Sequence, residues 1–348
     1  MPLLYFVSFA LAILISFAAT FLVSKIAVRR KILDLPDEDR RFHPQPTPTL
    51  GGIAIFSSFF LVTLAVGVFG GHLLYGNIPL KILFAIWAGG AILMIGGYLD
   101  DRYRLPARYS LIFPVIAALA LVTAGVKAVS VHNPLNNEVL ILMPLVSGLV
   151  VFLWTMTMTY TTKLLDGMDG LVTGVSAIAA LILFGVSLTP QVSQPQTALL
   201  AIIFAGSLLG FLILNFHPAK IFLGEGGSTF AGFMLAVLAV VSGAKIATAL
   251  LVMGIPLLDM IWVVALRLMN RQSPFSGDRK HLHFKLTEIG FSEPQAVLFL
   301  YALTGIFGGA ALFLQSRGKL ITLIILFLVM LAIIASLFSV YRSKKTNE

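Results

Sequence analysis

The feature that most constrains this chain is a succession of apolar segments, each close to the length of a membrane-crossing helix. A helix that spans a bilayer needs about 20 mostly apolar residues. The sequence therefore predicts an all-α polytopic membrane bundle with about eleven transmembrane helices. Ten spans remain an alternative, because residues 242–245 alone divide two of the segments. The predicted spans are 3–24, 49–69, 79–99, 109–125, 139–159, 170–189, 196–214, 228–243, 245–266, 295–315 and 319–340.

The composition agrees with a lipid-embedded chain. Hydrophobic residues make up 58% of it and charged residues 11%, whereas soluble domains carry about 25% charged residues. A net charge of +9 is a feature shared with nucleic-acid-binding proteins. Here the basic residues lie in loops between apolar segments, which the positive-inside rule explains, so we expect no nucleic-acid partner. The absence of cysteine excludes disulfides, thiolate metal sites and cysteine nucleophiles.

The distribution of basic residues predicts the orientation. With the N-terminus outside and eleven spans, nineteen of the 24 Lys and Arg residues fall on the cytoplasmic side. The C-terminus is then cytoplasmic. Of the acidic residues, Glu138 alone lies in an outside loop, and Asp259 lies within a predicted span. Because the charged groups form one layer, we expect a site on the cytoplasmic face of the cell membrane (inner or plasma membrane).

The predicted organisation is one transmembrane catalytic domain, residues 1–341, followed by a short basic cytoplasmic tail, residues 342–348. The first apolar stretch is too long for a cleaved signal peptide and is predicted to be a retained helix. Cytoplasmic loops are expected near 25–48, 100–108, 160–170, 215–228 and 267–294.

Two carboxylate pairs fall at the predicted inner boundary. Asp100 and Asp101 end the third span, and Asp166 and Asp169 have the i, i+3 spacing that places both on one face if the segment is helical. Hard cations such as Mg2+ bind carboxylates together with substrate phosphates. Each pair alone is also compatible with a solvated helix end or a capping Asp beside a turn. Their common position favours a shared metal–diphosphate site.

Two further segments carry groups suited to phosphate. Glu225 lies in a glycine-rich stretch just before a span, where backbone N–H groups can bind an anion, although a flexible turn is the simpler interpretation. Arg279, His281 and His283 lie in a dense basic segment of the late cytoplasmic loop. The positive-inside rule explains the basic residues of this segment but not its histidines.

Two other features remain open at this stage. His43 begins a proline-rich segment that the prolines make stiff and extended, either as a shaped loop beside the reaction face or as a plain connector. Asp259 is an ionisable group within a span, which indicates function by default. A pairing partner such as Arg267 or Lys163 is the alternative.

Taken together, these motifs resemble the polyprenyl-phosphate N-acetylhexosamine-1-phosphate transferases of glycosyltransferase family 4. The resemblance runs from about residue 43 to residue 283. The order of the histidines is more similar to members that use UDP-GlcNAc or a related UDP-HexNAc than to the related phospho-MurNAc-pentapeptide translocase, which remains an alternative. The resemblance rests on five motifs. They are the prolines before Gly51 and Gly52, the pair Asp100–Asp101, the Asp-Gly motif at 166–170, the Gly-acid-x-Gly-Ser stretch at 224–228, and the motif formed by Asp278, Arg279, His281 and His283.

The resemblance implies a reaction and its participants. HexNAc-1-phosphate, most simply GlcNAc-1-phosphate, passes from a UDP-sugar to polyprenyl (undecaprenyl) phosphate with release of UMP. This would be the first membrane step of cell-envelope polysaccharide synthesis, such as lipopolysaccharide or teichoic acid. Mg2+ is the implied cofactor, with Mn2+ as a substitute, and a homodimer is a further expectation. Catalysis would rest on positioning and charge neutralisation.

The resemblance also implies roles for individual residues. Asp100, Asp101, Asp166 and Asp169 would be catalytic, and the metal would be held by Asp101, Asp166 and Asp169. Asp166 or Asp169 is a candidate base or nucleophile, and direct attack and a covalent aspartyl intermediate both stay open. Substrate contacts are expected from His43, Lys163, Glu225, Arg279, His281 and His283.

The chain departs from the family pattern at three positions. Tyr160 and Lys163 replace two asparagines, and Glu225 replaces an aspartate. One hypothesis is that Lys163 supplies a positive charge to the diphosphate. A catalytically inactive, lipid-binding family member is therefore an alternative, although all four Asp and both His of the motifs are present. A transporter is the alternative of another class, but it would place charged groups at mid-membrane and often shows internal repeats.

Overall fold

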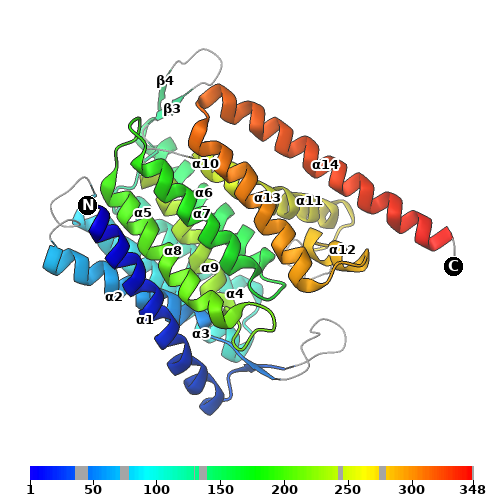
Figure 1. Cartoon of the computed structure of the whole chain (residues 1–348), viewed down its shortest axis with the longest axis horizontal. Helices are drawn as coiled ribbons and strands as arrows, with labels where there is room; N and C mark the ends of the chain where they lie inside the picture. The colour runs from blue at the N-terminus through cyan, green and yellow to red at the C-terminus, as the bar shows by residue number, and fades with distance from the viewer. Residues whose placement is uncertain are drawn as a thin grey trace.

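The computed structural model describes residues 1–35, 46–70, 78–128, 130–132, 139–241, 246–273 and 280–346 (Figure 1). Within these ranges nine helices are long and apolar enough to cross a membrane. The predicted all-α, polytopic membrane fold is confirmed. The side of the membrane on which each end lies stays a prediction. The nine helices are α1 (Pro2–Arg29), α2 (Gly51–Gly70), α3 (Leu80–Tyr103), α6 (Pro144–Leu165), α7 (Leu171–Leu188), α8 (Pro195–Asn215), α9 (Gly224–Val241), α13 (Glu293–Phe313) and α14 (Ser316–Thr346).

The remaining elements are short. Two antiparallel strand pairs, β1 (Leu33–Asp34) with β2 (Thr47–Pro48) and β3 (Ser130–His132) with β4 (Val139–Ile141), are the sheet structure of the described residues. The short helices are α4 (Ala107–Ser110), α5 (Ile112–Thr123), α10 (Ile246–Val252), α11 (Gly254–Met269) and α12 (Leu282–Glu288).

Two predicted spans differ from simple membrane helices. The segment predicted at 109–125 contains α5, which has 12 residues and is shorter than a bilayer-spanning helix. The segment predicted at 245–266 is divided into α10 and α11, whose axes differ by 78°. Gly254 and Pro256 stand at this break, and such residues are the usual cause of sharp bends. If the bent pair counts as one span, the described residues have up to 10 spans.

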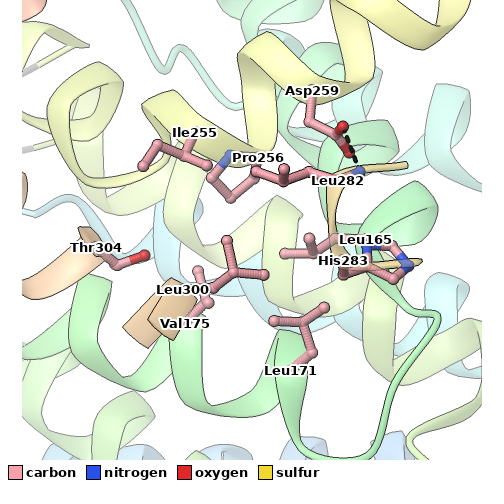
Figure 2. Close-up of a pocket in the computed structure, with 10 residues that line it drawn as sticks. All are labelled: Leu165, Leu171, Val175, Ile255, Pro256, Asp259, Leu282, His283, Leu300 and Thr304. Carbon is pink, nitrogen blue, oxygen red and sulfur yellow. Dashed lines mark hydrogen bonds between the residues drawn. The ribbon is translucent and has the colours of Figure 1, made fainter. Parts of the chain in front are cut away.

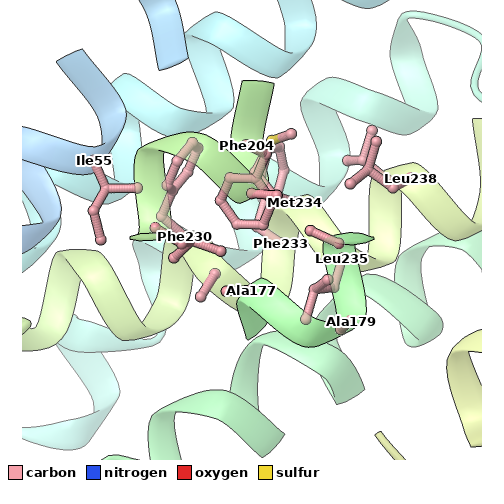
Figure 3. Packing of buried hydrophobic residues seen from close by; sticks show 14 of the residues in the cluster. Ile55, Ala177, Ala179, Phe204, Phe230, Phe233, Met234, Leu235 and Leu238 are labelled. Atoms are coloured by element: carbon pink, nitrogen blue, oxygen red, sulfur yellow. The ribbon is translucent and has the colours of Figure 1, made fainter. Parts of the chain in front are cut away.

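The centre of the bundle is formed by α8 and α9. In the most apolar stretch of each of these helices 83% of the residues are buried, against 11% in α14. In Figure 1, α14 runs along the edge of the bundle. Figure 3 shows aromatic rings at the centre. Phe230 of α9 packs edge-to-face on Phe204 of α8 at 5.8 Å and on Phe56 of α2 at 5.4 Å. Such contacts favour one fixed packing of the three helices.

Glycines bring the beginning of α9 against two other helices. A Cβ atom on Gly97 of α3 would collide with the backbone of Gly226, and one on Gly52 of α2 would collide with the backbone of Gly227. Small residues permit such close helix contacts in membranes. The close approach places the first turn of α9 beside the last turn of α3.

The segment before α9 is tied to the start of α2 by main-chain hydrogen bonds. The Phe222 N–H donates to Pro48 at 2.8 Å, and the N–H groups of Gly51 and Gly52 donate to Phe222 and Leu223 at 3.1 and 2.8 Å. Two motifs far apart in the sequence, the glycine pair at 51–52 and the glycine-rich stretch at 224–228, therefore form one structural unit.

Candidate active site

The candidate active site lies where the polar ends of α3, α6 and α9 meet. Asp100 and Asp101 occupy the last turn of α3, Asp166 is the C-cap residue of α6, and Glu225 lies in the first turn of α9. The charged residues of these helices lie at the helix ends, beyond the apolar stretches. Three segments distant in sequence thus bring four carboxylates to one end of the bundle.

Asp101 holds the beginning of α9. Its Oδ1 accepts a hydrogen bond from the backbone N–H of Glu225 at 3.2 Å. The first N–H groups of a helix have no partner within the helix, and a negative charge there is favourable. The carboxylate is half-buried. Asp101 therefore connects α3 to α9 and sets where Glu225 stands.

Asp100 has an unsatisfied atom. Its Oδ1 is buried and accepts no hydrogen bond from the described residues. Glu225 and Lys163 both act electrostatically on this carboxylate. Buried polar atoms in native proteins are nearly always paired, and an exception indicates strain, an ordered water or an ion. A carboxylate oxygen without a donor suits a cation.

Asp166 experiences repulsion from its neighbours. Desolvation by the surrounding protein, followed by the negative charges of Glu225, Asp101 and Asp169, raises the pKa of Asp166 to about 8, against a hydrogen bond from Ser228 that lowers it. The residue as a whole is exposed, while its carboxyl group lies near the other carboxylates. A carboxyl group in this position gains from any cation that approaches.

Lys163 supplies a positive charge within this group. Its Nζ lies 2.5 Å from Glu225 Oε1 and donates to Ser110 Oγ at 3.1 Å. The Ser110 hydroxyl in turn donates to Glu225 Oε1 at 3.3 Å. The Lys163 ammonium also lies 5.6 Å from the centre of the Tyr160 ring. Of the three departures from the family pattern, Lys163 thus pairs with Glu225 and lies over the ring of Tyr160.

Asp169 faces a different set of partners from the other carboxylates. Its Oδ2 accepts the backbone N–H of Ala219 at 2.9 Å and lies 3.1 Å from Nδ1 of His217. The same Nδ1 lies 3.2 Å from Oε2 of Glu293. These three side chains could hold a metal ion, since their ligand atoms lie within 4.8 Å of one another. His217 and Glu293 were not found from the sequence, because neither belongs to a local motif and they meet Asp169 only in the fold.

His283 packs against the loop that carries Asp166. It is 1% exposed, and neither ring nitrogen has a hydrogen-bond partner among the described residues. A Cβ atom added to Gly167 would collide with its ring. Burial, and secondarily His281, lowers the pKa of His283 to about 3, so the imidazole is neutral.

His281 and Asp259 are joined. Asp259 Oδ2 lies 2.8 Å from Nδ1 of His281, and Asp259 Oδ1 accepts the backbone N–H of Leu282 at 2.8 Å. Figure 2 shows Asp259, Leu282 and His283 around a small, mostly apolar cavity. The acid predicted within a span thus binds a histidine of the late loop, a partner that the sequence did not suggest. His43 and Arg279, predicted to bind substrate, lie outside the described residues.

Comparison with known proteins supports the resemblance. The sequence pattern of glycosyl transferase family 4 matches residues 83–243. A probable undecaprenyl-phosphate N-acetylglucosaminyl 1-phosphate transferase of Bacillus subtilis is 30% identical, over 93% of this chain and 89% of its own length. A decaprenyl-phosphate N-acetylglucosaminephosphotransferase of Mycobacterium leprae is 32% identical, over 86% of this chain and 81% of its own. An undecaprenyl-phosphate alpha-N-acetylglucosaminyl 1-phosphate transferase of Yersinia pestis is 28% identical, over 90% of this chain and 87% of its own length.

These likenesses extend over nearly the whole chain and include the segments that build the candidate site. This multi-pass membrane protein therefore belongs to glycosyl transferase family 4.

Proposed function

We propose that this protein transfers GlcNAc-1-phosphate from UDP-GlcNAc to a polyprenyl phosphate and releases UMP. The proposal places the reaction at the cytoplasmic face of the cell membrane, in one catalytic domain. The names of the relatives support the transferred group and the acceptor, and UDP-GlcNAc is the donor that the motif resemblance implies. The observation that carries the proposal is the meeting of Asp100, Asp101, Asp166 and Glu225 at one end of the bundle, with Lys163 among them.

The proposed reaction exchanges one phosphorus–oxygen bond for another. An oxygen of the polyprenyl phosphate attacks the phosphorus that carries GlcNAc, and the bond between that phosphorus and the bridging oxygen of the diphosphate breaks. UMP leaves with the electron pair of that bond. The attacking phosphate is already anionic, so the protein has mainly to align two anions and reduce their repulsion.

The oxygen donors of the site fit Mg2+, with Mn2+ as a substitute. Mg2+ favours one or two carboxylates together with substrate phosphates. The buried Asp100 Oδ1 has no hydrogen-bond partner among the described residues, and Asp166 lies near the negative charges of Glu225, Asp101 and Asp169. We assign the cation to Asp101 and Asp166, assisted by Asp100. When bound, it would neutralise charge on the transferring phosphoryl group.

Asp169 takes another place in this proposal. The hydrogen bond that it accepts from the Ala219 N–H and its contact with His217 direct it toward the segment after α8. We propose that it borders the site and orders the loop between α6 and α7, while Asp166 carries the reaction. A covalent aspartyl intermediate would then involve Asp166, whereas direct attack by the acceptor phosphate needs no protein nucleophile.

The test is an assay of the purified protein. It contains radiolabelled UDP-GlcNAc, polyprenyl phosphate and Mg2+, and we expect a lipid-linked radioactive product together with UMP in equal amount. Asp100→Asn should abolish most of the product, and Glu288→Gln, an equivalent change on α12 outside the site, should not. Absence of product with every UDP-HexNAc, from protein that still binds the lipid, would exclude the enzyme. Full activity of Asp100→Asn would exclude the assigned site.

A further inference from the structure

Asp259 is a buried acid that the proposed reaction does not use directly. It lies in α11, is 4% exposed, and uses both oxygens: Oδ2 toward Nδ1 of His281 and Oδ1 toward the backbone N–H of Leu282, each at 2.8 Å. His281 is the N-cap residue of α12 and Leu282 its first residue. One carboxylate thus binds the side chain and the main chain at the start of this helix.

Arg267 approaches His281 from its other side. It lies two helical turns after Asp259 on the same buried face of α11, with Val263 between them. Arg267 is 0% exposed, and its Nη2 lies 3.5 Å from Nε2 of His281. A guanidinium can only donate, so Nε2 must accept. The carboxylate at Nδ1 requires a donor there. The two neighbours together select the neutral imidazole that carries its hydrogen on Nδ1.

The two histidines of the motif have different contacts. His281 is 4% exposed and has both ring nitrogens occupied by protein groups. His283 stacks parallel to it, with ring centres 5.7 Å apart and planes 9° from parallel. It is His283 that touches Gly167, next to Asp166. Whatever fixes His281 therefore also fixes the ring that packs on the loop of the candidate site.

We propose that Asp259 is a positioning residue for the transfer reaction: through His281 it fixes the start of α12 and holds His283 against the loop that carries Asp166. His281 is then a positioning residue as well, and not a ligand of substrate phosphate. The proposal rests on the proposed function for its catalytic consequence, but the tautomer and the place of His281 follow from the contacts alone.

The first test replaces Asp259 by Asn, which keeps the size and an acceptor for the Leu282 N–H. The NH2 group of Asn then donates a hydrogen bond to Nδ1 of His281. The hydrogen of the neutral imidazole must move to Nε2, where it faces the Arg267 guanidinium. We expect kcat to fall about 10- to 100-fold, as for other residues that orient a functional group. Glu288→Gln on α12 is the matched carboxylate-to-amide control and should leave kcat unchanged.

The direct readout is the tautomer of His281. The chain has six histidines, so 15N-histidine NMR of the purified protein, assigned with His281→Asn, can resolve its two ring nitrogens. We expect Nδ1–H in the wild type and Nε2–H in Asp259→Asn. This measurement needs no turnover. A protein that shows Nδ1–H but transfers no sugar phosphate would contradict the proposed function alone.

A pair of variants at position 281 covers the case in which Asp259→Asn does not fold. Asn at this position can still donate to Asp259 and is a good N-cap residue, whereas Ala offers neither. If His281 only positions α12, His281→Asn should be several-fold more active than His281→Ala. Equal loss in both variants, or a wild-type tautomer other than Nδ1–H, or full activity of Asp259→Asn, would each overturn the inference.

Discussion

At the scale of single residues, the contact between Lys163 and Glu225 changes how the departures from the family pattern are understood. Each departure taken alone changes a side chain of the family pattern. In the structure they compensate, because the ammonium of one lies 2.5 Å from the carboxylate of the other and Ser110 joins both. The site thus contains its own positive charge among several carboxylates.

This pairing predicts coupled effects. Lys163→Asn should weaken UDP-GlcNAc binding, because Glu225 is then left without its partner beside the other carboxylates. The double variant Lys163→Asn with Glu225→Gln, which removes both charges, should lose less affinity than the sum of the two single losses. Donor affinity measured by titration calorimetry for all four proteins tests this. Additive losses, or unchanged affinity in Lys163→Asn, would contradict it.

The carboxyl group of Asp166 predicts a pH dependence. Desolvation and the charges of Glu225 and Asp101 raise its pKa from 3.8 to about 8, so between these values the folded protein holds a proton that the unfolded chain has released. The stability contributed by this group is complete below pH 3.8 and is lost as the pH rises through about 8. Without added divalent cations, the thermal midpoint should fall over this range.

Thermal unfolding of the purified protein, followed by intrinsic fluorescence, provides the measurement. Asp166→Asn should remove this part of the pH dependence, and Glu288→Gln should keep it. Mg2+ should raise the midpoint more at pH 8 than at pH 5, because a bound cation favours the deprotonated carboxylate. An identical pH profile for wild type and Asp166→Asn would show that another group is responsible.

At the scale of elements, the site depends on how closely α9 approaches α3 and α2. Gly97→Ala should destabilise the protein by about 1–3 kcal/mol, the usual cost of forcing an extra group into a packed region, since the added methyl group meets main-chain atoms of Gly226 that cannot rotate away. Activity should fall with it. Gly305→Ala on α13, where no other group lies within 4 Å, is the control and should be neutral or slightly stabilising.

The loss is measured as the change in thermal midpoint and in transfer rate. If Gly97→Ala had the same thermal midpoint and transfer rate as the Gly305→Ala control and the wild type, the close approach of α3 and α9 would not be needed to assemble the site.

The elements also show how far the sequence alone could lead. The long apolar segments predicted all nine long helices, because a bilayer leaves few other ways to satisfy main-chain polar groups. The 78° bend between α10 and α11 was missed, since apolar composition continues through it. The motif residues predicted that Asp100, Asp101 and Asp166 lie at one end of the bundle, but not that Asp169 contacts His217. They did not predict that Lys163 binds Glu225 or that Asp259 binds His281, because these pairs are set by packing between distant helices.

At the scale of the whole molecule, the predicted orientation can be tested without background labelling, because the chain has no cysteine. Gln272→Cys lies in the loop predicted to be cytoplasmic, and Lys127→Cys in a loop predicted to be outside; both positions are exposed. A membrane-impermeant maleimide applied to intact cells should label the second and not the first. Opened cells should give labelling of both. Labelling of Gln272→Cys in intact cells would show that the orientation is the reverse of the predicted one.

The hydrogen bonds between Pro48 and Phe222, and from Gly51 and Gly52 to Phe222 and Leu223, have a further consequence for how this protein can vary. They join main-chain atoms, which nearly every amino acid supplies in the same form. Side chains near the site, such as the Lys163–Glu225 pair, can therefore be exchanged over evolutionary time while the frame that places them persists. At position 222 proline is excluded, because it has no N–H to give. Tolerance of every residue but proline at Phe222 would be the mutational signature of such a frame.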